Sequence, residues 1–131
     1  MSIIKKIKNL ELPFGKYVVI GSGILEPLGI RIASDIDIAA LPELHEQLRL
    51  TGQWKEELRH NKIFLKRNAI EINPRLSWSN YQTTTQEAIA SATVIDGIPF
   101  MNLVELCKFK KALGREKDIK DIQLIDEYLS K

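Results

Sequence analysis

The sequence contains little of what small proteins use to brace their folds covalently. Among its 131 residues there are only one cysteine and two histidines. A single Cys cannot form an internal disulfide, and together with two His it cannot supply the four ligands of a structural zinc site. The 5 prolines and 7 glycines form no linker, and no repeat divides the chain. We therefore expect one continuous domain over residues 1–131, long enough to bury a core without such braces.

The chain also lacks a strong surplus of charge and any long apolar run. Its 19 basic and 17 acidic residues give a net charge of +2, too small to indicate nucleic-acid binding by itself. Apolar stretches such as Tyr17–Ile20 are far shorter than the roughly 20 residues of a membrane span. The start, Met-Ser-Ile-Ile-Lys-Lys, has no apolar segment typical of a signal peptide. We expect a cytoplasmic protein with no membrane partner.

The first part of the chain predicts short strands and one well-bounded helix. Residues 17–20 form a β-branched run that stops at Gly21-Ser22-Gly23, and residues 24–28 allow only a turn or two of helix. Residues 35–40 alternate polar and apolar, which predicts a strand with one acidic face. Proline at the start and glycine beyond the end favour a helix over 42–50. Three further strands, at 54–58, 62–66 and 69–72, suggest an antiparallel meander.

The rest of the chain is predicted to be mainly helical. A helix over 85–92 precedes a pair of short extended segments over 93–100 with a turn at Asp96-Gly97. Asn102 caps a helix that Gly114 closes, and a last helix over 117–129 is expected to bury Ile119, Ile122, Ile125 and Leu129. The order of elements predicts a mixed α/β (α+β) fold, with a small sheet flanked by helices and a helical C-terminal tail.

Three carboxylates are placed to share one site. In a strand, Asp35 and Asp37 point to the same side and lie about 7 Å apart along the chain. Such close like charges favour a divalent cation between them, and magnesium binds carboxylate and phosphate oxygens together. Glu71 lies between Ile70 and Ile72 in another predicted strand. If that strand is a neighbour, three carboxylates converge, as a pair of metal ions about 4 Å apart requires.

The turn at Gly21-Ser22 supplies a complement to these acids. Glycine lets backbone N–H groups approach a phosphate closely, and a helix that starts there adds partial positive charge. Taken alone, a Gly-Ser-Gly turn or an Asp-Ile-Asp strand is a weak signal, because both are common in sites that bind nothing. Their combination is more specific than either.

These strings resemble the signature of the polymerase-beta-like nucleotidyltransferase superfamily. The resemblance is carried by Gly21-Ser22-Gly23, Gly29-Ile30-Arg31 and Asp35-Ile36-Asp37-Ile38. The C-terminal segment is similar to the helical tail of small bacterial members related to abortive-infection toxins, at Leu103, Leu106, Lys110, Gly114-Arg115, Lys117-Asp118 and Asp121-Ile122. Together the similarity spans about residues 17 to 125.

The resemblance implies a nucleotidyltransferase-type fold and a magnesium-dependent enzyme. Such an enzyme moves a nucleoside monophosphate from a nucleoside triphosphate to an acceptor hydroxyl, with two magnesium ions and release of pyrophosphate. It implies Asp35, Asp37 and Glu71 as catalytic metal ligands, with Glu71 also able to take the acceptor proton. It assigns nucleotide binding to Gly21 and Ser22, with Arg31 and Lys110 as further candidates. The acceptor, which is RNA, a protein or a small molecule, stays open.

Several residues have two interpretations. Arg31 contacts a phosphate or forms a structural salt bridge. Lys110 contacts the triphosphate or offsets a helix dipole, the latter being favoured for Lys117. Asp118 and Asp121 are expected to cap or stabilise the last helix. The remaining candidates are a core thiol at Cys107, surface histidines at His45 and His60, a core Trp54, an exposed ligand contact at Trp78, and a basic side formed by Lys62, Lys66, Arg67 and Arg75.

A second functional class is also open. Members of a superfamily can keep the fold and lose catalysis. The alternative is therefore a decayed nucleotidyltransferase-fold module that acts as a toxin–antitoxin or regulatory partner of another protein.

Overall fold

The structure is a computed structural model, which describes residues 2–77 and 81–131. Its helices are α1 (Ile3–Lys8), the 3-10 helix η1 (Gly21–Leu25), α2 (Pro42–Leu50), α3 (Thr85–Ala90), α4 (Leu103–Leu113) and α5 (Glu116–Leu129). Its strands are β1 (Tyr17–Ile20), β2 (Ile36–Ala40), β3 (Lys55–Arg59), β4 (Lys62–Arg67), β5 (Ile70–Asn73), β6 (Thr93–Ile95) and β7 (Ile98–Phe100). The predicted mixed α/β class is confirmed.

The strands of the described residues form one mixed sheet in the order β3-β4-β5-β2-β1-β7-β6. β5 runs parallel to β2 and β7 runs parallel to β1, while all other neighbours are antiparallel. The predicted antiparallel meander of β3, β4 and β5 is therefore confirmed. The order also places β2 at the centre of the sheet, next to both β1 and β5.

The core face of the sheet follows from the apolar alternation. Ile36 and Ile38 of β2 and Ile72 of β5 are fully buried. Because successive side chains of a strand point to opposite faces, the residues between these isoleucines lie on the other face. That other face carries the acidic side chains of β2 and β5.

Local turn and cap chemistry explains where most elements end. His60 and Asn61, with φ of 52° and 60°, form the tight turn between β3 and β4, which suits the twist of a hairpin. Asp96 and Gly97 turn β6 into β7 in the same way. The Asn102 side chain accepts a hydrogen bond from the Glu105 N–H, and so caps α4 as predicted.

Helix α1 was not predicted by the sequence analysis. Ser2 caps it by accepting from the Lys5 N–H, and Ile3 and Ile7, four residues apart, are both buried. The backbone N–H of Ile3 also donates to the Glu26 carboxylate at 2.7 Å. The apolar spacing of Ile3 and Ile7 was a usable signal, but a helix of six residues is too short to stand out by periodicity.

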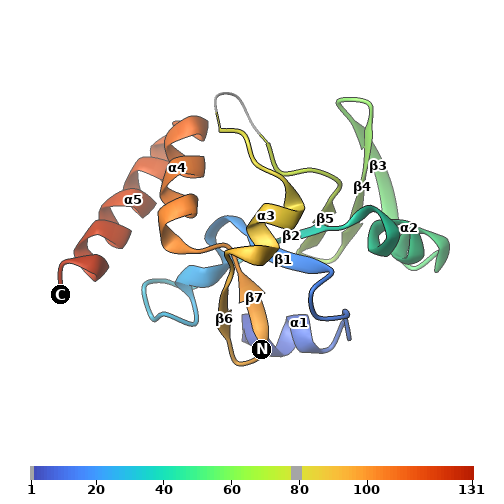
Figure 1. Cartoon of the computed structure of the whole chain (residues 1–131), viewed down its shortest axis with the longest axis horizontal. Coiled ribbons are helices and arrows are strands. Elements are labelled where there is room, and N and C mark those ends of the chain that lie inside the picture. The colour runs from blue at the N-terminus through green and yellow to red at the C-terminus, as the bar shows by residue number, and fades with distance from the viewer. Residues whose placement is uncertain (1, 78–80) are drawn as a thin grey trace.

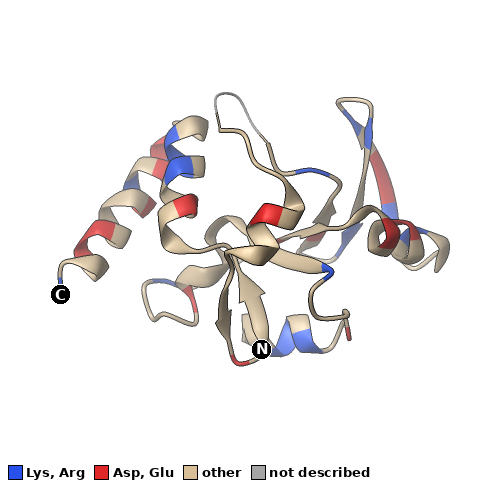
Figure 2. Cartoon of the chain, viewed as in Figure 1, with Lys and Arg blue, Asp and Glu red and all other residues tan. Residues whose placement is uncertain are grey.

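The helical tail and the β3–β4 hairpin lie at opposite ends of the molecule (Figure 1). Helices α4 and α5 pack side by side at one end, and the hairpin projects at the other. Figure 2 shows basic and acidic residues interleaved on both of these regions. Nothing in the described part of the chain forms a helix long and apolar enough to cross a membrane.

Candidate active site

The pairing of β2 with β5 brings two of the predicted acids side by side. In the parallel register, Asp37 lies opposite Glu71, flanked by the pairs Ile36–Ile70 and Ile38–Ile72. Residues that are opposite each other on neighbouring strands project from the same face. The carboxylates of Asp37 and Glu71 therefore leave the face opposite the buried isoleucines.

Asp35 reaches the same place from just outside the sheet. The prediction put it inside a strand, but β2 begins at Ile36 and Asp35 lies in an exposed bend before it. The side chains of Asp35, Asp37 and Glu71 all line one cavity of about 620 Å³. We call these three residues the acidic floor.

The electrostatics of the acidic floor show that its negative charges are poorly compensated. The pKa of Asp37 is raised to about 6, first by burial and then by the carboxylates of Glu71 and Asp35. The positive charges of Arg59 and Arg115 oppose this shift but do not cancel it. Placing a second charge of the same sign beside a partly buried carboxylate disfavours its ionised form. A cation bound at this floor would remove that penalty.

One arginine from the hairpin reaches the acidic floor. Arg59, at the end of β3, places its Nη2 2.7 Å from Oε2 of Glu71. Its guanidinium also lies over the ring of Phe64, 4.0 Å from the centroid. Arg59 was not predicted as a site residue, because nothing in the sequence around it indicates a contact with Glu71.

The Gly21-Ser22 turn borders the acidic floor from β1. Ile20, the last residue of β1, is in register with Asp37, so the turn follows at the same edge. Gly21 has φ of 63°, and a Cβ built there would lie 3.5 Å from Oδ2 of Asp37. The left-handed backbone therefore favours glycine here, whereas a Cβ would only be in ordinary contact with the acid.

The helix after this turn differs from the predicted one. The prediction placed a turn or two of helix over residues 24–28, whereas η1 begins at Gly21 and ends at Leu25. Gly23 is needed for packing, because a Cβ there would lie 2.6 Å from Cγ1 of Val19. Since η1 is a single short 3-10 stretch, little dipole accumulates along it.

A second group of charges joins η1 to the helical tail. The carboxylate of Asp121 on α5 accepts from Arg31 Nε and Nη2, both at 2.7 Å, and from Ser22 Oγ at 3.1 Å. Lys110 Nζ lies 2.8 Å from Asp121 Oδ2 and donates to Ser22 Oγ at 2.8 Å. Nearby, Asp118 pairs with Lys110 and with Arg115, at 3.4 Å and 2.6 Å. We call the five residues of this group the tail cluster: Arg31, Lys110, Arg115, Asp118 and Asp121.

The tail cluster corrects the predicted buried face of the last helix. Ile119 and Leu129 were expected to be buried, but they are 52% and 56% exposed. Asp118 and Asp121 are buried instead, together with Ile125. Charged residues can occupy the inner face because Lys110 of α4 is itself buried against them. Ile125 is fully buried as predicted and Ile122 is half-buried, so the prediction is right in part. Periodicity counts only apolar residues, and it therefore missed the two buried acids.

Both acids of the tail cluster are held in their ionised form. Burial acts to raise the pKa of Asp121, but hydrogen bonds from Arg31 and Lys110 outweigh it and hold that pKa well below its usual range. For Asp118, burial is likewise outweighed, chiefly by the hydrogen bond from Arg115, and the pKa is lowered. Asp118 also caps α5 by accepting from the Arg115 N–H, which confirms its predicted role as a cap.

The predicted nucleotide-binding residues are gathered at the same cavity. Gly21, Ser22, Arg31 and Lys110 all line it with the acidic floor. The salt-bridge interpretation of Arg31 is confirmed by its contact with Asp121. Lys110 is buried rather than a surface charge at a helix end. Three further cations line the cavity without an ion pair in the described residues: Lys62, Arg75 and Lys117.

The acidic floor has the donor chemistry that magnesium prefers, although the site is not a closed cage. Within residues 2–77 and 81–131, no three His, Cys, Asp or Glu side chains are arranged to hold a metal ion. Asp35 and Asp37 offer hard carboxylate oxygens toward one cavity, and magnesium is commonly bound by one or two carboxylates with phosphates and water completing the shell. Glu71 is the third donor, and it is engaged by Arg59.

The remaining candidates differ in where they lie. His60 is exposed at the hairpin turn, as predicted, and lines the same cavity as the acidic floor. His45 was predicted to lie at the surface, but it is half-buried and shares a hydrogen bond of 2.8 Å with the Ile63 carbonyl. Trp54 is buried as predicted. Cys107 is partly buried rather than fully buried, and burial raises the pKa of its thiol. The predicted ligand contact at Trp78 falls outside the described residues.

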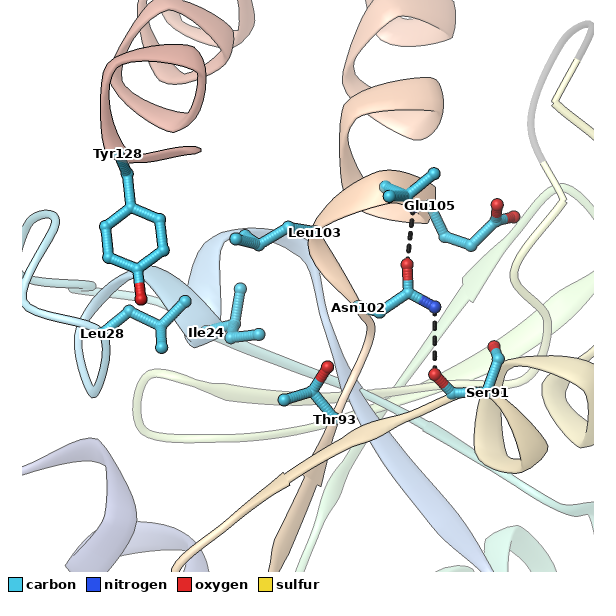
Figure 3. A pocket seen from close by; sticks show the side chains of 9 residues that line it. Ile24, Leu28, Ser91, Thr93, Asn102, Leu103, Glu105 and Tyr128 are labelled. Atoms are coloured by element: carbon cyan, nitrogen blue, oxygen red, sulfur yellow. Dashed lines mark hydrogen bonds between the residues drawn. The ribbon is translucent and has the colours of Figure 1, made fainter. Parts of the chain in front are cut away.

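A second cavity, of about 580 Å³, has a different character (Figure 3). Ile24 and Leu28 line it together with Leu103 and Tyr128. Its acid, Glu105, points away in Figure 3 and is already paired with Tyr81 and Lys108. The cavity therefore lacks a cluster of reactive groups like that of the acidic floor.

Comparison of the chain with protein-family models, with curated proteins and with solved structures found no match. The site is therefore interpreted from its own geometry and charge.

Proposed function

We propose that this protein is a magnesium-dependent nucleotidyltransferase with a nucleotidyltransferase-type fold. In the proposed reaction it moves a nucleoside monophosphate from a nucleoside triphosphate to an acceptor hydroxyl. The observation that carries the proposal is the in-register pair of Asp37 and Glu71 on neighbouring parallel strands. This pair opens to the same cavity as Asp35 and the Gly21-Ser22 turn.

The reaction in this proposal breaks one bond and forms one. The acceptor oxygen attacks the α-phosphorus, the bond between the α-phosphorus and the bridging oxygen to the β-phosphate breaks, and pyrophosphate leaves. The acceptor proton passes to the carboxylate of Glu71. Two magnesium ions, when bound by Asp35, Asp37 and Glu71, supply neutralisation of the charge on the phosphate oxygens.

The chain's own groups position the nucleotide. Gly21 allows backbone to approach the phosphates closely, and Ser22 offers its hydroxyl beside it. Arg31 and Lys110 bring positive charge to the same side of the cavity, where Asp121 is now their partner. A triphosphate would share these two cations with Asp121. Catalysis in such a site comes mainly from positioning and charge stabilisation.

The test is calorimetric binding of each nucleoside triphosphate with and without magnesium. We compare the wild type with the double variant Asp35→Asn/Asp37→Asn. The double variant Asp126→Asn/Glu127→Gln serves as a matched control, because it removes two exposed acids from α5. We expect magnesium-dependent binding by the wild type and the control, and at least a tenfold loss in the Asp35/Asp37 variant. Equal binding by all three folded proteins would contradict the proposed site.

A second candidate function is favoured by the tail cluster itself. Arg31, Lys110 and Ser22 already bind the carboxylate of Asp121, so the groups assigned to phosphate are satisfied without it. This arrangement suits a decayed module that binds a protein partner, in a toxin–antitoxin pair or as a regulatory subunit. It predicts no nucleotide binding by the folded wild type and a partner complex that Asp37→Asn leaves unchanged.

A further inference from the structure

We propose that Arg59 is a built-in counter-ion of the acidic floor, which occupies Glu71 until a divalent cation displaces it. Arg59 would thereby be a positioning residue that sets when Glu71 becomes the third metal ligand. This inference rests on the proposed function, since it assumes that Asp35 and Asp37 bind the cation. It concerns the contact between the hairpin and β5. The resemblance to a known family implies no role for this contact.

The closer of the two ion pairs of Arg59 is with Glu71. Arg59 Nη2 lies 2.7 Å from Glu71 Oε2, whereas Arg59 Nε lies 3.8 Å from Oε2 of Glu57. The side chain of Glu71 is only 17% exposed. Among the described residues, Asp35 and Asp37 form no ion pair. One of the three carboxylates of the acidic floor is thus matched by a cation, and two are not.

The hairpin holds Arg59 in this position. Its guanidinium rests on the ring of Phe64, which belongs to the opposite strand of the hairpin. A cation over an aromatic face is attracted by the electrons of the ring. The turn residues His60 and Asn61 follow directly, both with left-handed backbone. Arg59 is therefore held where it lines the cavity and contacts Glu71.

A divalent cation and the Arg59 guanidinium would compete for Glu71. Asp37 and Glu71 are in register, so a cation on Asp37 comes within reach of the Glu71 carboxylate. Two positive groups on one carboxylate repel each other at such distances. Arg59 holds Oε2 of Glu71, so a metal ion that takes this oxygen displaces Arg59, and part of the metal affinity is lost in displacing it. Removing the arginine charge should make metal binding tighter.

The experiment measures Mn²⁺ binding to the nucleotide-free protein from the electron paramagnetic resonance signal of the free ion. Mn²⁺ alone is the probe for the magnesium site. We expect Arg59→Gln to bind Mn²⁺ about three- to fivefold more tightly than the wild type, in line with the modest strength of a partly exposed ion pair. The gain should vanish in Arg59→Gln/Glu71→Gln compared with Glu71→Gln, as a double-mutant cycle requires.

Arg67→Gln is the matched control. It removes the same charge from the same meander, but Arg67 is in register with Ile70 and lies over Trp54 rather than Glu71. Its Mn²⁺ affinity should equal that of the wild type. A general effect of net charge would raise the affinity of both variants equally, and would overturn the proposal.

The remaining outcomes separate this inference from the proposed function. If the wild type and Arg59→Gln bind Mn²⁺ equally, with binding lost in Asp35→Asn/Asp37→Asn, the role of Arg59 is wrong and the metal site stands. If the wild type and Arg59→Gln bind Mn²⁺ no more tightly than Asp35→Asn/Asp37→Asn does, Asp35 and Asp37 do not bind the metal. The proposed metal site is then wrong, and this inference fails with it. Should Arg59→Gln not fold, Arg59→Met removes the same charge and should show the same gain in Mn²⁺ affinity over the wild type. Arg59→Lys, which keeps the charge, should bind Mn²⁺ as the wild type does.

Discussion

The acidic floor and the tail cluster border the same cavity but differ in how their charges are matched. In the tail cluster, the carboxylates of Asp118 and Asp121 contact three cations and are held ionised. In the acidic floor, three carboxylates have one cation in contact, and the pKa of Asp37 is raised to about 6. The matched charges join η1 to the helical tail, whereas the unmatched charges are suited to bind a ligand.

The two regions show two ways in which charges can be carried at one cavity. A buried charge whose partners are all supplied by the chain contributes to the architecture, and breaking it is costly. A charge left without partners is tolerated at the expense of stability, which is typical of sites that bind ligands. Substitutions in the two regions should therefore change stability in opposite directions.

The largest effect is expected in the tail cluster, from Lys110→Met. Lys110 is buried and contacts Asp118, Asp121 and Ser22. Its removal leaves two buried carboxylates with less compensation, so we expect a loss of about 3 kcal/mol in the free energy of unfolding. Urea denaturation measures this loss. Lys111→Met, at the exposed neighbouring position, should cost less than about 0.5 kcal/mol, and a similar loss for both variants would contradict the structural role.

A smaller effect of opposite sign is expected in the acidic floor, from Asp37→Asn. The folded-state pKa of Asp37 is about 6 against an ordinary value of 3.8. Below pH 4 the carboxyl is protonated in both the folded and the unfolded wild type, and it does not lower the free energy of unfolding. Between pH 4 and 6 the unfolded state ionises first, so the free energy of unfolding falls, and above pH 6 the full loss is present. We expect Asp37→Asn to raise the free energy of unfolding by about 2 kcal/mol at pH 7.5, and to change it little at pH 4.

Urea denaturation at pH 4 and pH 7.5, without divalent cations, tests whether Asp37→Asn raises or lowers the free energy of unfolding. The exposed acid Asp126 supplies the control, since Asp126→Asn should show no such gain. A destabilising effect of Asp37→Asn at pH 7.5 would mean that Asp37 is matched by a cation, like the acids of the tail cluster.

The smallest effect is expected for an exposed ion pair outside both regions. Arg49 contacts Glu56 at 3.1 Å and Glu46 at 3.7 Å, and all three side chains are substantially exposed. We expect Arg49→Gln to lower the free energy of unfolding by less than about 0.5 kcal/mol, because solvent screens such pairs. The same urea titration measures this loss. A loss as large as that of Lys110→Met would show that burial does not determine how much an ion pair contributes to the free energy of unfolding.

Much of the fold was predictable because local rules act within each element. The helix over 42–50, the turn at Asp96-Gly97 and the Asn102 cap all follow from residues next to one another. The meander was predictable for the same reason, since short turns join antiparallel neighbours. The error in α5 arose from distant contacts, because Asp118 and Asp121 are buried against Lys110 and Arg31. Helix α1 was missed for a local reason, since six residues are too few for periodicity to stand out.

Most of the secondary structure, and the grouping of Asp35 with Asp37, could be predicted because both depend on spacing along one segment. The pairing of β5 with β2, which brings Glu71 beside Asp37, became visible in the folded structure alone. The tertiary structure also decided that Arg59 contacts Glu71 and that Asp121 takes Arg31, Lys110 and Ser22 as partners. These contacts join residues far apart in the chain, where neither periodicity nor local spacing carries information about which charges will meet.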